Sequence, residues 1–219
     1  MSDNFFLLAN ITTDLVLLFT FFYSVTKLSK YKRQKNYLLI VIYLLIASIF
    51  CIVNELRYYK LVRININYYI PFALIHQFVL IKYIMIEIDK LLKSKFLEAL
   101  FYSFILIQFG FYYIDYNNES FYSASFSNFS ILLYSVIYFY ILFNNEISIE
   151  HIPKYSFLII VGIFISTSLI FPIMIFGKYL FETLNKAQYH LIASIAPIAS
   201  LIFYLFIFKS ILCLEKTNT

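Results

Sequence analysis

The sequence predicts an all-α, polytopic membrane protein, a bundle of seven transmembrane helices that forms one domain over residues 1–219. Seven long apolar stretches fill almost the whole chain, and the charged residues lie in the short gaps between them. A helix of about 20 apolar residues spans the hydrocarbon core of a bilayer. In addition, only 13% of the residues are charged and the mean hydropathy is +0.81, whereas a soluble domain carries about 25% charged residues.

Each stretch is long enough for a membrane-spanning helix and lacks the polar–apolar alternation of a barrel strand. The first is not preceded by a basic segment, so we expect it to remain as a helix and not to be cleaved as a signal peptide. Pro153 precedes the sixth stretch, where its missing N–H costs nothing, and Pro71, Pro172 and Pro197 should kink their helices locally. The expected spans are residues 5–26, 37–56, 68–88, 96–114, 125–143, 155–176 and 189–209.

The charges in the gaps predict the orientation. Cytoplasmic loops carry an excess of lysine and arginine. The third gap contains three lysines beside one acid, and the fourth contains two acids and no base, although three basic residues in the second gap go against the pattern. We therefore expect the N-terminus outside and the C-terminus inside, and we take the membrane to be a bacterial inner membrane. The strongest cytoplasmic signal is the first gap, with five basic residues and no acid: Lys27, Lys30, Lys32, Arg33 and Lys35.

Ionisable and amide side chains inside the spans are the candidate site residues, because such groups are costly in hydrocarbon. At the helical rise, Asp14 and His76 both lie about 12–13 Å from the outer starts of their spans. We interpret the layer as an outward-facing ligand pocket in which these two side chains pair, the alternative being polar contacts that hold helices together. Lys82 and Glu87 lie near enough to the cytoplasm to snorkel. The candidate ligand-binding residues are Asp14, Asn54, Glu55, His76, Gln77, Gln108 and Ser166.

Several classes of function are disfavoured. The last span has no central lysine for retinal, no two histidines are spaced for a zinc site, and no glycine-rich phosphate loop is present. Cys51 and Cys213 have neither disulfide nor metal spacing. The net charge of +5 follows from the orientation and does not indicate nucleic acid. We therefore expect no enzymatic activity, metal or cofactor.

The chain resembles a group of small bacterial seven-helix proteins that are similar to the membrane part of some sensor histidine kinases. The resemblance implies the seven-helix fold and a sensory role without naming a substrate. It extends over most of the chain and is carried by Lys30-Tyr31-Lys32-Arg33, Glu55, Tyr69-Ile70-Pro71-Phe72, His76-Gln77, Lys154-Tyr155-Ser156-Phe157 and the segment from Ser200 to Phe206.

The sequence thus favours a non-enzymatic membrane protein that senses a signal or regulates a partner. Because the chain ends shortly after the last span, any output should pass through another protein, in the cytoplasm or the membrane. The basic residues Lys30, Lys32, Arg33 and Lys35 are the candidate contacts for that partner or for anionic membrane lipid. A small transporter or channel, and a membrane accessory or effector of a bacterial defence system, are the alternatives.

Overall fold

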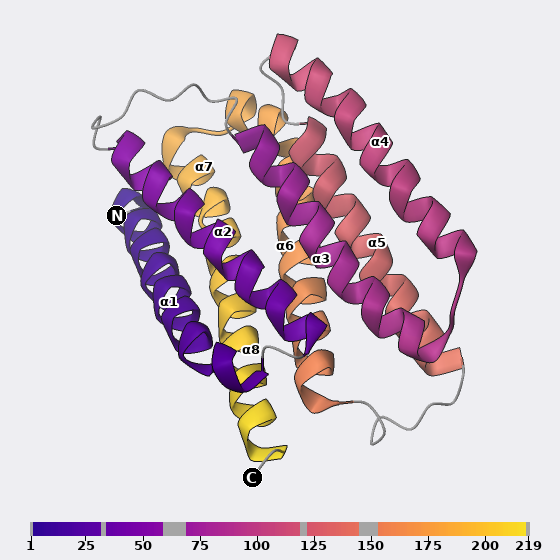
Figure 1. Cartoon of the computed structure of the whole chain (residues 1–219). Coiled ribbons are helices and arrows are strands. Elements are labelled where there is room, and N and C mark those ends of the chain that lie inside the picture. Colours follow the sequence, from indigo (N-terminus) through magenta and orange to yellow (C-terminus); the bar gives the residue numbers. More distant parts are fainter. Residues whose placement is uncertain (1, 32–33, 59–68, 119–121, 145–152, 218–219) are drawn as a thin grey trace.

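The computed structural model describes the chain except for residues 1, 32–33, 59–68, 119–121, 145–152 and 218–219 (Figure 1). The described part is helical apart from short turns. Its helices, in order, are α1 (Ser2–Tyr31), α2 (Lys35–Tyr58), α3 (Tyr69–Leu91), α4 (Lys95–Asn118), α5 (Tyr122–Asn144), α6 (Lys154–Thr183), α7 (Lys186–Ala193) and α8 (Ile195–Thr217).

The predicted all-α class is confirmed, and six stretches are long and apolar enough to cross a membrane. They fall in α1, α2, α4, α5, α6 and the combined stretch of α7 and α8. The helix missing from this set is α3, which carries Lys82, Glu87, Asp89 and Lys90 in its last ten positions. A seventh crossing and the orientation of the termini therefore stay predictions.

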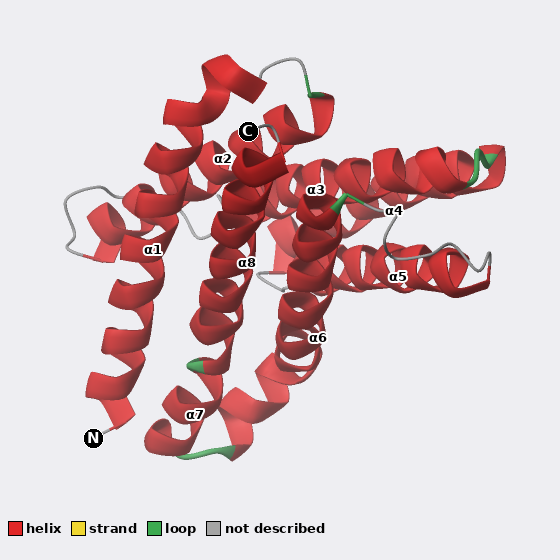
Figure 2. Cartoon of the chain, turned by 90° about the horizontal axis from the view of Figure 1, so that it is seen from below, coloured by secondary structure: helices red, strands yellow, loops and turns green. Residues whose placement is uncertain are grey.

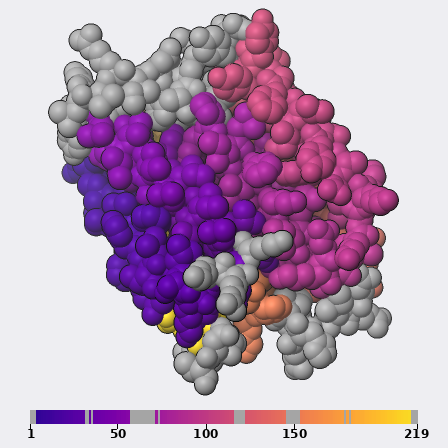
Figure 3. All heavy atoms as spheres, viewed as in Figure 1, coloured from indigo at the N-terminus to yellow at the C-terminus, as the bar shows by residue number. Residues whose placement is uncertain are grey.

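The outer surface of the bundle is apolar. On α1, the large side chains of Leu8, Leu15 and Phe22 are each more than 60% exposed and recur every seven residues, which places them on one face. The side chains of α1 to α4 form a closed surface on the face seen in Figure 3. A surface of this kind suits a hydrocarbon solvent, because exposing apolar side chains to water is unfavourable in free energy.

Six helices form a closed ring, and α4 lies outside it. Around the ring, α1 packs on α2, α2 on α3, α3 on α5, α5 on α6, α6 on α8, and α8 back on α1. The α6–α8 contact is the most extensive of these, and Figure 2 shows α6 and α8 running alongside each other. Among the described residues, the extensive contacts of α4 are with α3 and α5, so it covers the ring from outside and leaves most of its own surface free.

The bundle has two ends, which we name after the chain termini (Figure 1). The C-terminal end holds the end of α1, the start of α2, the end of α3, the start of α6 and the end of α8. The N-terminal end holds the start of α1, the end of α2, the start of α3, the end of α6 and helix α7. Consecutive long helices are therefore antiparallel, as expected for a chain that crosses a membrane repeatedly.

The last crossing is interrupted between α7 and α8. The interruption falls at Ser194, whose hydroxyl donates to the carbonyl of His190 (2.7 Å), one turn before Pro197. Proline cannot donate the backbone hydrogen bond that would continue the helix. The Thr13 hydroxyl on α1 lies 2.8 Å from the Ala9 carbonyl oxygen of its own helix and 2.9 Å from the Pro197 carbonyl oxygen, so α1 and α8 share its proton at this point.

Candidate functional site

A buried carboxylate joins three helices at the C-terminal end of the bundle. Glu87, one turn before the end of α3, is only 3% exposed. Its Oε1 accepts hydrogen bonds from the Asn36 side chain at the start of α2 and from the Ser156 hydroxyl at the start of α6 (3.0 Å). Lys90, one turn along α3, donates to the same oxygen at 2.8 Å. Glu87 therefore does not extend to the surface, as the sequence suggested, but points into the ring.

The Glu87 cluster, which we define as Glu87, Asn36, Ser156, Lys90 and Tyr83, is balanced in charge. The Lys90 ammonium is partly exposed and offsets the carboxylate. Charge-assisted hydrogen bonds are stronger than neutral ones, and both side chains that donate from other helices are buried. The cluster thus fixes the starts of α2 and α6 against α3.

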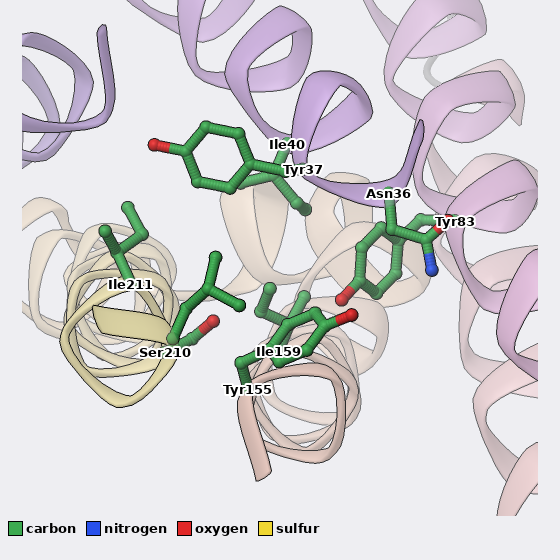
Figure 4. A pocket seen from close by; sticks show the side chains of 9 residues that line it. Asn36, Tyr37, Ile40, Tyr83, Tyr155, Ile159, Ser210 and Ile211 are labelled. Atoms are coloured by element: carbon green, nitrogen blue, oxygen red, sulfur yellow. The ribbon is translucent and has the colours of Figure 1, made fainter. Parts of the chain in front are cut away.

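A small cavity adjoins this cluster between α2, α3, α6 and α8 (Figure 4). It gives the centre of a water molecule about 10 Å³ of room, which suits about one water and excludes an organic ligand. The buried Tyr83 hydroxyl lies beside Ser156 but has no hydrogen-bond partner of good geometry among the described residues. The cavity is lined by Asn36, Tyr37, Ile40, Tyr83, Tyr155, Ile159, Ser210, Ile211 and Leu214.

A second polar cluster lies nearer the N-terminal end and contains both Asp14 and His76. The Asp14 carboxyl on α1 pairs with the Cys51 thiol on α2 and interacts with Tyr204 on α8. The hydroxyl of Tyr204 pairs with that of Tyr43 on α2, and the Tyr43 ring lies 5.5 Å from the His76 ring on α3. We call Asp14, Cys51, Tyr204, Tyr43 and His76 the Asp14 cluster.

The predicted direct pairing of Asp14 with His76 is not seen. Within the described part of the chain, the two form no ion pair. Tyr204, which interacts electrostatically with Asp14, and Tyr43, whose ring packs on His76, link them instead. His76 also packs on Phe72, with the ring centroids 5.9 Å apart. The structure therefore brings the two predicted residues into one cluster through aromatic side chains that the sequence did not single out.

The other predicted ligand-binding residues lie in different surroundings. Glu55 lies one turn beyond Cys51, interacts with it electrostatically, and thus borders the Asp14 cluster, whereas Asn54 beside it is exposed. Gln77 is 0% exposed, and both ends of its amide lack a partner among the described residues. Gln108 donates to the Ser123 carbonyl oxygen at 2.8 Å and so serves the α4–α5 contact. Ser166 is buried on α6.

Of the predicted basic contacts, Lys30 is exposed at the end of α1, with its ammonium 5.4 Å from the centroid of the neighbouring Tyr31 ring. Lys32 and Arg33 lie outside the described residues, and Lys35 begins α2 without a described side chain. Nearby, Lys27 pairs with Glu215 at 2.5 Å. This pair joins α1 to α8 at the same end of the bundle as the Glu87 cluster.

An apolar layer separates the two clusters. On α2, Ile40 lies between Asn36 and Tyr43 on the same face, and on α3, Leu80 lies between His76 and Tyr83. Both, together with Ile207 of α8, are essentially inaccessible members of the apolar core. Among the described residues, apolar core side chains therefore lie between the two polar clusters.

Sequence spacing could have located the Glu87 cluster. His76, Tyr83, Glu87 and Lys90 follow one another at intervals of seven, four and three residues, which puts them on one stripe of α3. A polar stripe along an otherwise apolar span indicates a face that packs against other helices and away from lipid. What spacing lacks is the identity of the opposing residues on α2 and α6.

No protein-family model, curated protein or solved structure matches the chain.

Proposed function

We propose that the protein is a non-enzymatic, seven-span sensory membrane protein that regulates a partner, with the N-terminal end of the bundle outside and the C-terminal end in the cytoplasm. The signal acts on the Asp14 cluster and the Glu87 cluster changes in response. Lys30, exposed in the last turn of α1, lies at the responding end, and the basic residues that follow it in the sequence are the proposed contacts for the partner.

One observation carries this proposal: α2 and α3 each contribute to both clusters. On α2, Asn36 and Tyr43 lie seven residues or about 10 Å apart, and on α3, His76 and Glu87 lie eleven residues or about 16 Å apart. A helix transmits a shift or rotation along its length, and packed helix interfaces switch between discrete arrangements. Movement of His76 against Tyr43 therefore alters how Glu87 meets Asn36.

The Glu87 cluster can change in response to the signal, because few and specific hydrogen bonds hold it together. Releasing α2 and α6 from α3 requires the loss of two buried hydrogen bonds to a single carboxylate oxygen. Among the described residues, the apolar layer leaves no chain of polar contacts between the clusters. The signal therefore passes as a movement of α2 and α3.

Hydrogen exchange of the protein in lipid nanodiscs tests this coupling. His76→Phe keeps an aromatic ring but removes the polar atoms, and Asp14→Asn removes the charge. We expect both to speed amide exchange at the starts of α2 and α6 and to leave α4 unchanged. The matched control is Thr20→Ala, since Thr20 is a buried polar residue of α1 outside both clusters. Equal exchange at the starts of α2 and α6 in all four proteins would refute the coupling.

A small transporter is the second candidate, favoured by the buried carboxylate of Glu87 beside a cavity of water size. Proteoliposomes loaded with a pH-sensitive dye distinguish the two. The sensor proposal requires no proton flux above that of empty vesicles, whereas a proton-coupled transporter gives flux that Glu87→Gln abolishes.

The orientation has its own test. In a background with Cys51→Ala and Cys213→Ala, a cysteine placed at Ser2 should react with an impermeant maleimide in intact cells. A cysteine placed at Lys216 should react only after the membrane is opened. The reverse pattern would overturn the orientation without affecting the coupling.

A further inference from the structure

Lys82 is a basic residue in the middle of α3 that neither cluster uses. Its side chain is partly exposed, and its ammonium lies 6.0 Å from the centroid of the Phe101 ring on α4. It forms no ion pair with any acidic side chain that the structure describes. Seven and four residues earlier on the same face, Ile75 and Phe78 are exposed, so Lys82 belongs to the outward face of α3.

The position of Lys82 keeps its charge away from the nearer membrane surface. It lies nine residues, or about 13 Å, from the end of α3 at Leu91. Side chains on a helix lean toward its N-terminus, and the N-terminus of α3 is at the opposite end of the bundle. Snorkelling toward the nearer end would therefore run against the direction that the helix imposes. A lysine at such depth is costly unless it has a partner.

None of the acidic side chains that the structure describes, on α3 or on the other helices, supplies that partner. Glu98, in the first turn of α4, is exposed and lies about 9 Å nearer the end of the bundle along the helix axes. Asp14 pairs with Cys51, and Glu87 with Lys90. The ring of Phe101 offers only a cation–π contact at the outer limit of its range.

The seam between α3 and α4 around Lys82 is exposed and apolar. Because α4 packs outside the ring, this seam lies on the surface of the molecule (Figures 1 and 3). Phe78 on α3 and Tyr102 on α4 are exposed, and both rings contact the Phe101 ring, at 5.6 and 5.3 Å between centroids. The seam thus combines an apolar, aromatic wall with one cation.

We propose that this seam binds a transmembrane helix of the partner protein, and that this helix carries an aspartate or glutamate at mid-depth to pair with Lys82. The inference rests on the proposed function, which requires a partner, and it names the chemistry of that partner. A carboxylate in the membrane fits better than a lipid phosphate, because lipid phosphates lie at the membrane surface, away from the direction in which Lys82 leans.

A transmembrane peptide provides the test. The full chain with Cys51→Ala and Cys213→Ala, labelled with an acceptor dye at a cysteine placed at Lys216, is put in phosphatidylcholine vesicles at pH 8 with a trace of donor-labelled, leucine-rich peptide. One peptide has glutamate at its centre, a second glutamine, and a third lysine. We expect energy transfer to report binding of the glutamate peptide about tenfold tighter than that of the glutamine peptide.

Two variants make the result specific. Lys82→Met, which keeps the length and apolar stem of the side chain, should bind the glutamate and glutamine peptides equally. Lys82→Glu should instead prefer the lysine peptide. Equal binding of the glutamate and glutamine peptides by the unaltered protein would overturn the proposal, as would a preference that survives Lys82→Met.

Two further arms separate the alternatives. If a few per cent of anionic phosphatidylglycerol displaces the glutamate peptide, the seam is a lipid site and the proposal is wrong. Energy transfer between two differently labelled copies of the chain that Lys82→Met abolishes would likewise assign the seam to self-association. In either case hydrogen exchange at the starts of α2 and α6 still tests the coupling of the clusters, because Lys82 lies in neither.

Discussion

Removing the charge of Glu87 should weaken the bundle by an amount that the geometry sets. In Glu87→Gln the side-chain oxygen can still accept the hydrogen bonds from Asn36 and Ser156, but without the charge. A hydrogen bond to a charged group contributes about 1.5–3 kcal/mol and a neutral one about 0.5–1.5 kcal/mol. The difference is about 1 kcal/mol for each of the two buried bonds, or about 2 kcal/mol in all, because the partly exposed Lys90 adds little.

Glu87→Ala should be more damaging than Glu87→Gln. It leaves the buried donors of Asn36 and Ser156 without an acceptor, and each unsatisfied donor costs about 1–3 kcal/mol. The expected loss is therefore about 2–6 kcal/mol. For a chain of this length, about 1 kcal/mol corresponds to a change in Tm of about 2–4 °C, so Glu87→Gln should lower Tm by about 4–8 °C and Glu87→Ala by more.

A thiol-reactive fluorogenic dye suits the measurement. The chain has no tryptophan, whereas the thiols of Cys51 and Cys213 are partly buried and in no disulfide, so unfolding should expose them to the dye. Lys27→Gln is the matched control, because it removes a charge from the more exposed pair with Glu215 at the same end, and it should change Tm far less. If Glu87→Gln melts within about 1 °C of the unaltered protein, the carboxylate does not hold these helices together.

Three other substitutions test the packing by the same assay. Gly162→Ala should lower the stability by about 1–3 kcal/mol, because a β-carbon there would lie 2.7 Å from the Cβ of Phe206 on α8. The control Gly110→Ala should not lower it, because a β-carbon there meets nothing within 4 Å. Asp115→Ala should cost about 1–2 kcal/mol, since it removes both hydrogen bonds to the first amides of α5, and hydrogen exchange there should rise. Thr13→Val should cost about 0.6 kcal/mol, because it loses one hydrogen bond to α8; no change in Tm would show that this bond is dispensable.

Hydropathy predicted the helices well because it measures a property of each segment alone. The sixth span was expected over residues 155–176 and lies within α6 (Lys154–Thr183), which extends about two turns further. The extension has a simple cause, since a helix does not have to end where the hydrocarbon ends. Pro197 was expected to kink the last span, and the interruption at Ser194 lies one turn before it.

The site was less accessible to prediction, because depth in a span does not reveal which helices are neighbours. Asp14 and His76 were placed at similar depth and do share a cluster. Gln108 was assigned to the same layer, yet α4 lies outside the ring, so its amide bonds to α5 instead. Glu87 was read as interfacial because its partners, Asn36 and Ser156, are 51 and 69 residues away in sequence.

The two tyrosines that link Asp14 to His76 could not be predicted from the composition. Tyr43 and Tyr204 are two among 21 tyrosines, and nothing in their local sequence distinguishes them from those that face outward. Their role depends on α2 and α8 approaching α1 together, which is a property of the whole ring.

The order of the ring also has a consequence for biosynthesis. Helix α8 supplies the contact between α1 and α6, so the circle stays open until the final helix has entered the bilayer. A nascent chain that stops before α8 leaves Asp14 without Tyr204 and one flank of α1 without its protein neighbour. Membrane proteases that recognise unshielded polar groups should therefore degrade truncated products, and a separately expressed α8 segment should protect them.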